Sequence, residues 1–322
     1  MAKLTWRGRE VPVHGEETVL DALERAGVAV ASSCRAGACQ SCVVRATHGA
    51  PPVAAQHGLR AALSAQGYFL ACRARLEADL DVVPADDLPA VKAVIARVER
   101  PSRDVTRLWI APQQPFPYRA GQFVHVVRGD GVTRPYSLAS VPDDPHLELH
   151  VRRMPGGAMS GYLCDEVAVG DTLTLRGPAG SCCYEEGRPA QPLLLAGTGT
   201  GLAPLLGVVR DALARGHTGP IALHHGALVA EGLYADADLA ALVARHPQLT
   251  YAPSVLQAPA DEARAGSIVD RFAQALRARP GARVFLCGPP ETVRALQRDA
   301  YLSGVKLRDI LSDPFVTAAA PR

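Results

Sequence analysis

The spacing of apolar residues changes twice along the chain, and each spacing predicts a different kind of element. In the middle of the chain, apolar and polar residues alternate with the period of strands that bury one face. Turn residues separate these runs, which favours a small antiparallel barrel. The alternating runs are VKAVIARVE at 91–99, RLWIAP at 107–112, GQFVHVV at 121–127, LELHVRR at 147–153 and DTLTLRG at 171–177.

Residues 192–322 have a different pattern, in which short continuous apolar runs alternate with segments of helical period. This alternation indicates βαβ units in a doubly wound parallel sheet. The expected strands are PLLLA at 192–196, IALHHGAL at 221–228, LTYAPSV at 249–255 and RVFLCG at 283–288. The expected helices lie at 202–216, 237–245, 269–278 and 291–302.

The first 83 residues show a third pattern, with short elements and many turns. LTWRGREVPV at 4–13 predicts a hairpin whose turn contains Gly8. Thr18 and Asp21 have the spacing of a capping box, so they predict the start of a short helix. The features that follow are a Pro/Gly-containing stretch up to Cys72, a strand-like LDVV at 80–83 and a linker-like PADDLPA at 84–90.

These patterns divide the 322 residues into three domains, which we place at 1–88, 89–188 and 189–322. The net charge of +2 gives no reason to expect nucleic acid or an anionic membrane as a partner. No apolar run reaches the length of a membrane span, and the N-terminus carries no apolar signal segment. Eight cysteines without a leader favour a reducing compartment, so we expect a cytoplasmic protein.

Four cysteines in the first third of the chain have the spacing of metal ligands. Cys34, Cys39 and Cys42 follow the pattern C-x4-C-x2-C, and Cys72 lies alone further on. This is the plant-type arrangement for a 2Fe-2S cluster, in which one loop supplies three thiolates and a distant residue supplies the fourth. Gly37 and its small neighbours leave room for backbone N–H groups to turn toward the cluster sulfurs.

Two other kinds of cysteine site fit this spacing less well. A structural zinc ribbon has two CxxC knuckles, whereas only Cys39 and Cys42 form one here. Disulfides need an oxidising compartment, which the missing signal segment argues against. Cys164, Cys182 and Cys183 fit no ligand spacing, and we interpret them as packing residues. As neighbours in a strand, the last two would point to opposite faces.

Four further motifs lie in the middle and last domains. RPYS at 134–137 follows a predicted strand, and MPGGAMSGYL occupies 154–163. GTGTGLAP at 197–204 lies between a strand and a helix, as a phosphate-binding turn does, although it is not the GxGxxG fingerprint. CGPP at 287–290 ends another strand. Taken singly, each motif also fits an ordinary strand end or turn.

Together, RPYS, GGAMS, GTGTGLAP and CGPP resemble the ferredoxin–NADP reductase superfamily. With the N-terminal cysteine motif, residues 1–316 resemble the three-domain ferredoxin–flavin–NAD reductases that serve bacterial ring-hydroxylating dioxygenases and multicomponent monooxygenases. The resemblance implies a β-grasp ferredoxin domain, a six-stranded antiparallel barrel for the flavin and an α/β doubly wound domain for the pyridine nucleotide.

The resemblance places the flavin on the RPYS motif. It implies that Arg134 binds the flavin pyrophosphate, for which a planar guanidinium with a permanent charge is suited. It also implies that Tyr136, after Pro135, lies against the isoalloxazine ring. The Ser137 hydroxyl would then reach toward flavin N5, where hydride arrives.

The second flavin motif implies a phosphate contact. Gly156 and Gly157 would let the backbone approach a phosphate closely. Ser160 would add its hydroxyl, and a helix starting near 160–163 would offer free N–H groups. In this family the second loop accompanies a dinucleotide, so the resemblance favours FAD over FMN.

The resemblance places the pyridine nucleotide on the last domain. Cys287 would lie beside the nicotinamide and shape the pocket without acting as a nucleophile. Phe315 of the tail motif SDPF would cover the flavin until nicotinamide displaces it, or would be a core aromatic residue instead. The segment Ala227–Asp238 has no Lys or Arg and several acidic residues, which favours NADH over NADPH. The other expected contacts are Gly197, Thr198, Gly199, Thr200, Gly201, Gly288 and Pro289.

These features predict an NAD(P)H-dependent iron–sulfur flavoprotein oxidoreductase. Tyr136, Ser137 and Cys287 would form the catalytic set, with hydride passing from NADH to FAD and single electrons leaving through the 2Fe-2S cluster. The expected acceptor is an oxygenase component or its ferredoxin, and we expect a monomer. Two alternatives stay open: a reductase for a biosynthetic dehydration–reduction, as in deoxysugar-forming relatives, and a non-catalytic electron-distributing subunit.

Overall fold

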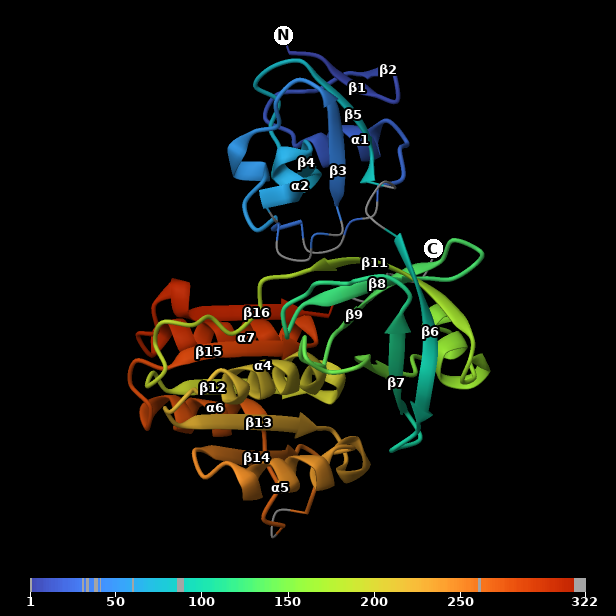
Figure 1. The fold of residues 1–322 in the computed structure, drawn as a ribbon. Helices are drawn as coiled ribbons and strands as arrows, with labels where there is room; N and C mark the ends of the chain where they lie inside the picture. The colour runs from blue at the N-terminus through green and yellow to red at the C-terminus, as the bar shows by residue number, and fades with distance from the viewer. Residues whose placement is uncertain are drawn as a thin grey trace. The chain divides into compact units, whose positions relative to one another are not determined.

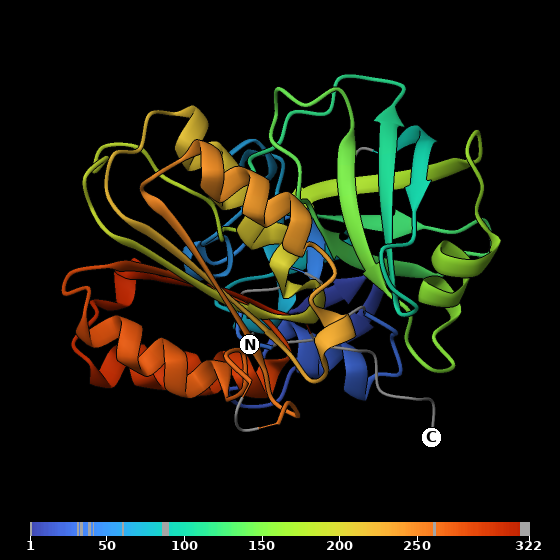
Figure 2. The ribbon, with the colours of Figure 1, turned by 90° about the horizontal axis from the view of Figure 1, so that it is seen from below.

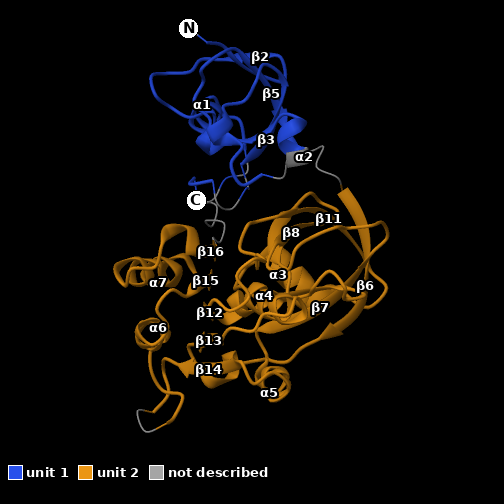
Figure 3. Ribbon diagram, turned by 60° about the vertical axis from the view of Figure 1, so that its left-hand side comes forward, with its two compact units in different colours: residues 1–89, 316–322 blue, residues 90–315 orange. Residues whose placement is uncertain are grey.

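The computed structural model describes residues 2–30, 32, 35–37, 40, 42–59, 61–85, 90–259 and 262–315. The chain divides into two compact units, one of residues 1–89 with 316–322 and one of residues 90–315 (Figure 3). The division falls at the end of the predicted linker. The second unit contains two separate sheets, and the domain boundary that we placed at 188 stays a prediction.

The first unit is a five-stranded sheet with two short helices. The strand order is β2-β1-β5-β3-β4, and β1 pairs in parallel with β5. Leucines and valines from α1 and from the sheet form one buried cluster. The elements are β1 Leu4–Trp6, β2 Arg9–Val11, α1 Val19–Arg25, β3 Val43–His48, α2 Ala61–Ala65, β4 Tyr68–Leu70 and β5 Leu80–Pro84 (Figure 1).

The local signals in this unit are confirmed. The β1–β2 turn contains Arg7 and Gly8, both with positive φ, at 50° and 80°. Thr18 and Asp21 form both hydrogen bonds of a capping box at the start of α1. The sequence pattern did not predict β3 and β4, because these short strands are defined by pairing with distant strands and not by a local period. It did not predict α2 either, because a helix of five residues is too short to show a helical period.

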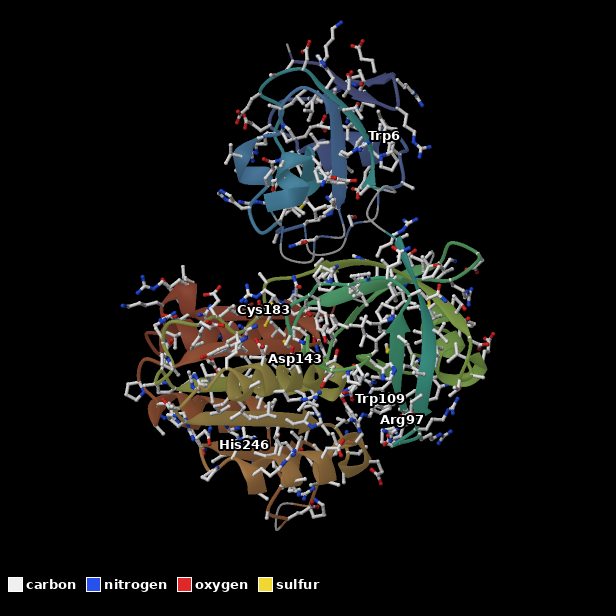
Figure 4. The ribbon with its side chains drawn as sticks, in the orientation of Figure 1. Trp6, Arg97, Trp109, Asp143, Cys183 and His246 are labelled. Atoms are coloured by element: carbon white, nitrogen blue, oxygen red, sulfur yellow. The ribbon has the colours of Figure 1, made fainter. Side chains whose placement is uncertain are left out.

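The second unit begins with a six-stranded antiparallel sheet, as predicted. The order is β10-β7-β6-β11-β8-β9, and a bridge between Leu138 and Leu149 joins the two edge strands. This bridge closes the sheet into a barrel. On the outside, the Arg97 guanidinium lies 4.3 Å from the centroid of the Trp109 ring (Figure 4). The strands are β6 Ala90–Glu99, β7 Val105–Pro112, β8 Phe123–Val127, β9 Thr133–Ser137, β10 Leu147–Arg152 and β11 Thr172–Ala179.

The rest of the second unit is the predicted parallel doubly wound sheet, with strand order β14-β13-β12-β15-β16. Helices α4 and α5 pack on one face and α6 and α7 on the other (Figure 2). The sequence indicates the fifth strand, β16, only through the tail motif SDPF. The elements are β12 Leu193–Thr198, α4 Leu202–Ala214, β13 Ile221–Ala227, α5 Asp236–Arg245, β14 Leu249–Val255, α6 Ile268–Arg277, β15 Arg283–Gly288, α7 Pro290–Leu302 and β16 Ile310–Pro314.

A buried polar network joins the barrel to the parallel sheet. Arg107 donates to Glu148 within the barrel, at 2.7 Å, and to Asp238 of α5, at 2.6 Å. The His150 ring lies between Glu148, at 2.9 Å, and the Tyr234 hydroxyl, at 2.8 Å. Burial alone would raise the pKa of Glu148, but the His150 and Arg107 contacts hold it at about 2. The carboxylate is therefore ionised at neutral pH, which keeps this ion-pair network intact.

One sequence interpretation is wrong. Cys182 and Cys183 do not lie in a strand, since β11 ends at Ala179 and an irregular segment follows. Both side chains are buried, but the alternation of faces expected in a strand does not apply to this segment. Among the helices that the structure describes, none has the length and apolar character needed to cross a bilayer.

Candidate functional site

Two of the four predicted cluster ligands lie in the described residues, and the fold brings them close together. Cys42 immediately precedes β3, and Cys72 lies in a turn immediately after β4. Because β3 and β4 pair antiparallel, the Ala71 N–H donates to the Cys42 carbonyl at 3.0 Å. Both cysteines are buried, at 3% and 7% exposure. Cys34 and Cys39 lie outside the described residues.

The described part of the cysteine loop has a backbone suited to a bound anion. Arg35, Gly37 and Gln40 all have positive φ, at 50°, 83° and 54°. Positive φ values also occur in backbone nests, whose N–H groups point to one side and bind Fe–S centres. A Cβ on Gly37 would lie 3.0 Å from the side chain of Arg73, so the loop packs against the turn that carries Cys72.

The side chains of the cysteine loop fix it to the rest of the first unit. Arg35 bridges Asp21 and Glu24 of helix α1. Gln40 is buried, and its side-chain amide donates to the Gly58 carbonyl at 2.8 Å. The described residues Arg35 and Gln40 are thus each held by side-chain contacts within the first unit. The two buried thiols of Cys42 and Cys72 fit the thiolate donor set of a 2Fe-2S cluster.

The RPYS motif forms strand β9 at the edge of the barrel. Pro135 is tolerated there because β9 pairs on one side only along its length, with β8. Arg134 is exposed, and its guanidinium donates to the neighbouring Thr133 carbonyl at 2.8 Å. Tyr136 is half-buried and Ser137 is buried. The motif therefore offers an accessible cation at its start and an enclosed hydroxyl at its end.

The second flavin motif differs from expectation in where its helix begins. Helix α3 spans Ala158–Gly161 and continues as a π-helical turn to Glu166, so the helix starts before Ser160 and not at it. The Ser160 hydroxyl accepts from the Met154 N–H at 3.1 Å and donates to the Gly157 carbonyl at 3.3 Å. It therefore stabilises the loop from within, and its predicted phosphate contact stays a prediction.

The two glycines of this motif serve different purposes. A Cβ on Gly157 would lie 2.4 Å from the Ser160 hydroxyl, so this glycine is needed for packing within the loop. Gly156 has a φ of 66° and open space around it. Because Gly156 is exposed and a Cβ there would meet no atom within 4 Å, its backbone is accessible to a ligand phosphate.

The glycine turn of the parallel sheet contacts the CGPP motif directly. The turn Gly199–Gly201 lies between β12 and α4. A Cβ on Gly201 would lie 2.4 Å from the Cys287 carbonyl oxygen and 2.9 Å from the Gly288 nitrogen. The buried Thr198 hydroxyl has no hydrogen-bond partner among the described residues. An unpaired hydroxyl next to a close backbone contact fits a site that is completed by a polar ligand.

One functional residue was missed by the sequence analysis. Asp313 of β16 pairs with Cys287 of β15, and its carboxylate accepts from the Ser137 hydroxyl at 2.9 Å. The carboxyl group is enclosed although the residue as a whole is half-buried, and this burial raises the pKa of Asp313 to about 6. Burial also raises the pKa of the Cys287 thiol. The SDPF motif is visible in the sequence, but nothing local indicates a role for Asp313, because its partner Ser137 lies 176 residues away.

Two further residues lie next to this group. Cys182 is a buried packing residue, as predicted, and its sulfur lies 3.8 Å from the Cys287 sulfur in the same hydrophobic cluster. The Phe315 N–H donates to the Gly288 carbonyl at 2.7 Å, and the half-buried ring belongs to none of the described hydrophobic clusters. This placement argues against a core role for Phe315 and leaves it available to a ligand.

The structure thus brings together the residues predicted for two different cofactors. Ser137 comes from the barrel, Cys287 and Gly201 from the parallel sheet, and Asp313 connects them. Electrostatically, the group is enclosed and polar, with a Cys287 thiol and an Asp313 carboxyl whose pKa values are both raised by burial. Such a site favours transfer of hydride between bound cofactors over nucleophilic catalysis by the thiol, whose thiolate is suppressed.

Three protein-family models match the chain in succession. A 2Fe-2S iron-sulfur cluster binding domain matches residues 4–77, an oxidoreductase FAD-binding domain matches 92–184, and an oxidoreductase NAD-binding domain matches 195–298. The order and positions agree with the cysteine loop, the barrel and the parallel sheet.

Proteins of known function resemble the chain over nearly its whole length. The naphthalene 1,2-dioxygenase system ferredoxin–NAD(P)(+) reductase component of Pseudomonas putida is 34% identical over 95% of this chain and 96% of its own. The aromatic O-demethylase reductase subunit of an Amycolatopsis species is 36% identical over 89% and 90%. The crystal structure of the Amycolatopsis cytochrome P450 reductase GcoB matches with a TM-score of 0.72 and 34% identity, covering 99% of this chain and all of that one. The chain therefore belongs to the family of three-domain ferredoxin–NAD(P)H reductases, iron–sulfur flavoproteins that transfer electrons from NAD(P)H through FAD to a 2Fe-2S cluster.

Proposed function

We propose that this reductase supplies single electrons to an oxygenase component or to that component's ferredoxin, with NADH as the electron donor. The observation that carries the proposal is the contact between Ser137, Asp313 and Cys287, because it joins the predicted flavin residues to the predicted nicotinamide residues. The relatives named above are reductase components of oxygenase systems, which supports this acceptor over the biosynthetic alternative. We further propose a monomer that acts in the cytoplasm.

Each predicted site residue has a role that its chemistry supports. When bound, FAD takes a hydride from the nicotinamide and releases electrons singly, and the 2Fe-2S cluster carries single electrons. The exposed Arg134 guanidinium would bind the flavin phosphates, with the Gly156 backbone beside them. Tyr136 would cover the flavin ring, while the glycine turn at 197–201 and Pro289 would hold the nucleotide. Cys42 and Cys72 would be cluster ligands together with Cys34 and Cys39.

The preference for NADH is supported by the edge of the parallel sheet where β13 and β14 end. Leu228, Val229 and Leu256 are exposed there, at 56%, 43% and 59%, which forms an apolar surface next to the acidic Glu231. Arg264 lies near this edge, but its guanidinium is paired with Asp236. An apolar and acidic edge suits an adenosine ribose without a 2′-phosphate.

An assay with purified oxygenase components of aromatic substrates tests the proposed acceptor. We expect NADH consumption to become coupled to substrate hydroxylation when the oxygenase that this reductase serves and its aromatic substrate are added. The measurement is the ratio of hydroxylated product to NADH oxidised. A ratio near zero with every oxygenase tested, together with turnover of a sugar-nucleotide dehydration product, would favour the biosynthetic alternative.

The Ser137–Asp313 contact predicts a pH dependence of flavin reduction by NADH. Above about pH 6 the Asp313 carboxylate accepts a hydrogen bond from the Ser137 hydroxyl. Below about pH 6 the protonated Asp313 carboxyl donates to the Ser137 oxygen, and the Ser137 hydroxyl can then donate its own hydrogen to another partner. We expect the rate at saturating NADH to rise about tenfold as the pH falls through this range.

Two variants test this assignment by rapid-mixing absorbance between pH 5 and pH 8. Asp313→Asn keeps a donor toward Ser137 at every pH, so its rate should stay high and independent of pH. Ser137→Ala should also lack the transition, but at a low rate. A transition of normal size in either variant would show that another group titrates.

A further inference from the structure

The side chain of His225 in β13 contacts the glycine turn at 197–201, the nucleotide turn. Its side chain is fully buried, and Nε2 lies 3.0 Å from the Gly199 carbonyl oxygen. We infer that His225 is a positioning residue that holds the Gly199 peptide, and with it the 197–201 turn, in the shape that binds the pyridine nucleotide. This inference rests on the proposed role of that turn.

The protonation state of His225 follows from its surroundings. Burial lowers the pKa of His225 to about 4, so the ring is neutral at physiological pH and carries a single N–H. The Gly199 carbonyl only accepts, so the proton must lie on Nε2. The Tyr251 hydroxyl is 3.4 Å from Nδ1, but its hydrogen is donated to Asp236 at 2.7 Å. The bond to Gly199 is therefore the hydrogen bond that the histidine donates.

The Gly199 carbonyl accepts two hydrogen bonds, one from His225 and one from the Leu202 N–H at the start of α4. Gly199 has a φ of 55°, in the left-handed region, and lies in the turn between β12 and α4. Its carbonyl is turned toward β13, where apolar side chains line the same face of the sheet. Without His225, the carbonyl would keep only the Leu202 N–H and would lose its donor on the side that faces β13, so the turn would be held less firmly.

The ring of His225 is itself fixed from the barrel side. It lies edge-on to the Tyr234 ring, with centroids 5.8 Å apart. The Tyr234 hydroxyl in turn lies 2.8 Å from His150 of β10. The nucleotide turn is thus connected through His225 and Tyr234 to His150 of the barrel, which fixes the orientation of the His225 ring.

The neighbouring His224 provides a matched control within the same strand. It is also buried, at 7% exposure, but points to the opposite face, as successive strand residues do. Its Nδ1 has no hydrogen-bond partner in the described part of the chain. Replacing His224 therefore changes a buried histidine of β13 without touching the Gly199 carbonyl.

The test measures the dissociation constant of NAD+ by calorimetry with the oxidised holoenzyme, and the rate of flavin reduction at saturating NADH. We expect His225→Leu to weaken NAD+ binding about tenfold, because the Gly199 carbonyl loses one of its two donors. His225→Gln places an amide N–H where Nε2 was and should restore binding to within about twofold. The rate at saturating NADH should change little in both, and His224→Leu should bind NAD+ normally.

The variants also separate this inference from the proposed role of the turn. Gly201→Ala alters the turn directly, so unchanged NAD+ binding in that variant would overturn the proposed site itself. Weak binding by Gly201→Ala with normal binding by His225→Leu would overturn only the role of His225. Should His225→Leu fail to retain FAD, the comparison of His225→Gln with His225→Asn decides, since the shorter amide cannot reach Gly199. Equal binding by these two would contradict the inference.

Discussion

Cys72→Ser is expected to abolish electron transfer to cytochrome c while leaving NADH-dependent reduction of a two-electron dye. Cys72 is a buried thiol on the turn that packs against the cysteine loop, and it is the predicted fourth cluster ligand. A serine hydroxyl is a poor ligand for cluster iron, so the 2Fe-2S cluster should be lost or strongly altered. We expect cytochrome c reduction to fall by about 100-fold. The dye assay should be unaffected because the flavin and nucleotide residues lie in the other unit.

A second buried cysteine controls for the substitution itself. Cys183 is equally buried, but it lies in the second unit and outside the ligand pattern (Figure 4). Cys183→Ser should therefore keep the visible absorbance of the cluster and both activities. Iron content and FAD content are measured for each variant. If Cys72→Ser lost both activities while FAD remained bound, the assigned separation of flavin and cluster roles would be wrong.

Gly201→Ala is expected to disable hydride transfer without disturbing the cluster. The added methyl would lie 2.4 Å from the Cys287 carbonyl oxygen and 2.7 Å from its carbon, and both are backbone atoms that cannot rotate away. The turn or the CGPP strand end must therefore move. A displacement of this kind between nicotinamide and flavin should slow flavin reduction by about 100-fold, measured by rapid mixing with NADH.

The matched control for this prediction is Gly129→Ala. A methyl group added to Gly129 would have no atom within 4 Å, and the residue lacks a positive φ, so the same chemical change meets no obstacle. We expect normal flavin reduction by Gly129→Ala. Chemical reduction of the cluster by dithionite should be normal in both variants. A normal rate of flavin reduction in Gly201→Ala would show that the close contact with Cys287 does not serve the reaction.

Much of the fold follows from local patterns in the sequence. The alternating runs became barrel strands, and the apolar runs between helices became the parallel sheet, because each period determines which face is buried. The capping box at Thr18 and the turn at Gly8 were likewise predictable. By contrast, β3, β4 and β16 depend on pairing with distant strands, which leaves little trace in a short segment.

The sequence predicted the motifs of the candidate site, but it did not predict which of their residues contact one another in the fold. The cysteine spacing and the four later motifs identified residues of the right chemistry. Asp313 was not assigned a role, because it acts through Ser137, which lies 176 residues away in the sequence. Cys182 was correctly interpreted as a packing residue, but its contact with Cys287, 105 residues away, could not be predicted. Such partners become visible only when the fold is known.

Rapid mixing of the oxidised holoenzyme with NADH in the absence of oxygen tests the central claim most directly. Flavin absorbance and cluster absorbance are followed together in a single turnover. We expect the flavin band to bleach first and the cluster band to decrease afterwards, as electrons pass from FAD to the 2Fe-2S cluster. Bleaching of the flavin with no later reduction of the cluster, or reduction of the cluster before the flavin, would contradict this order of electron transfer.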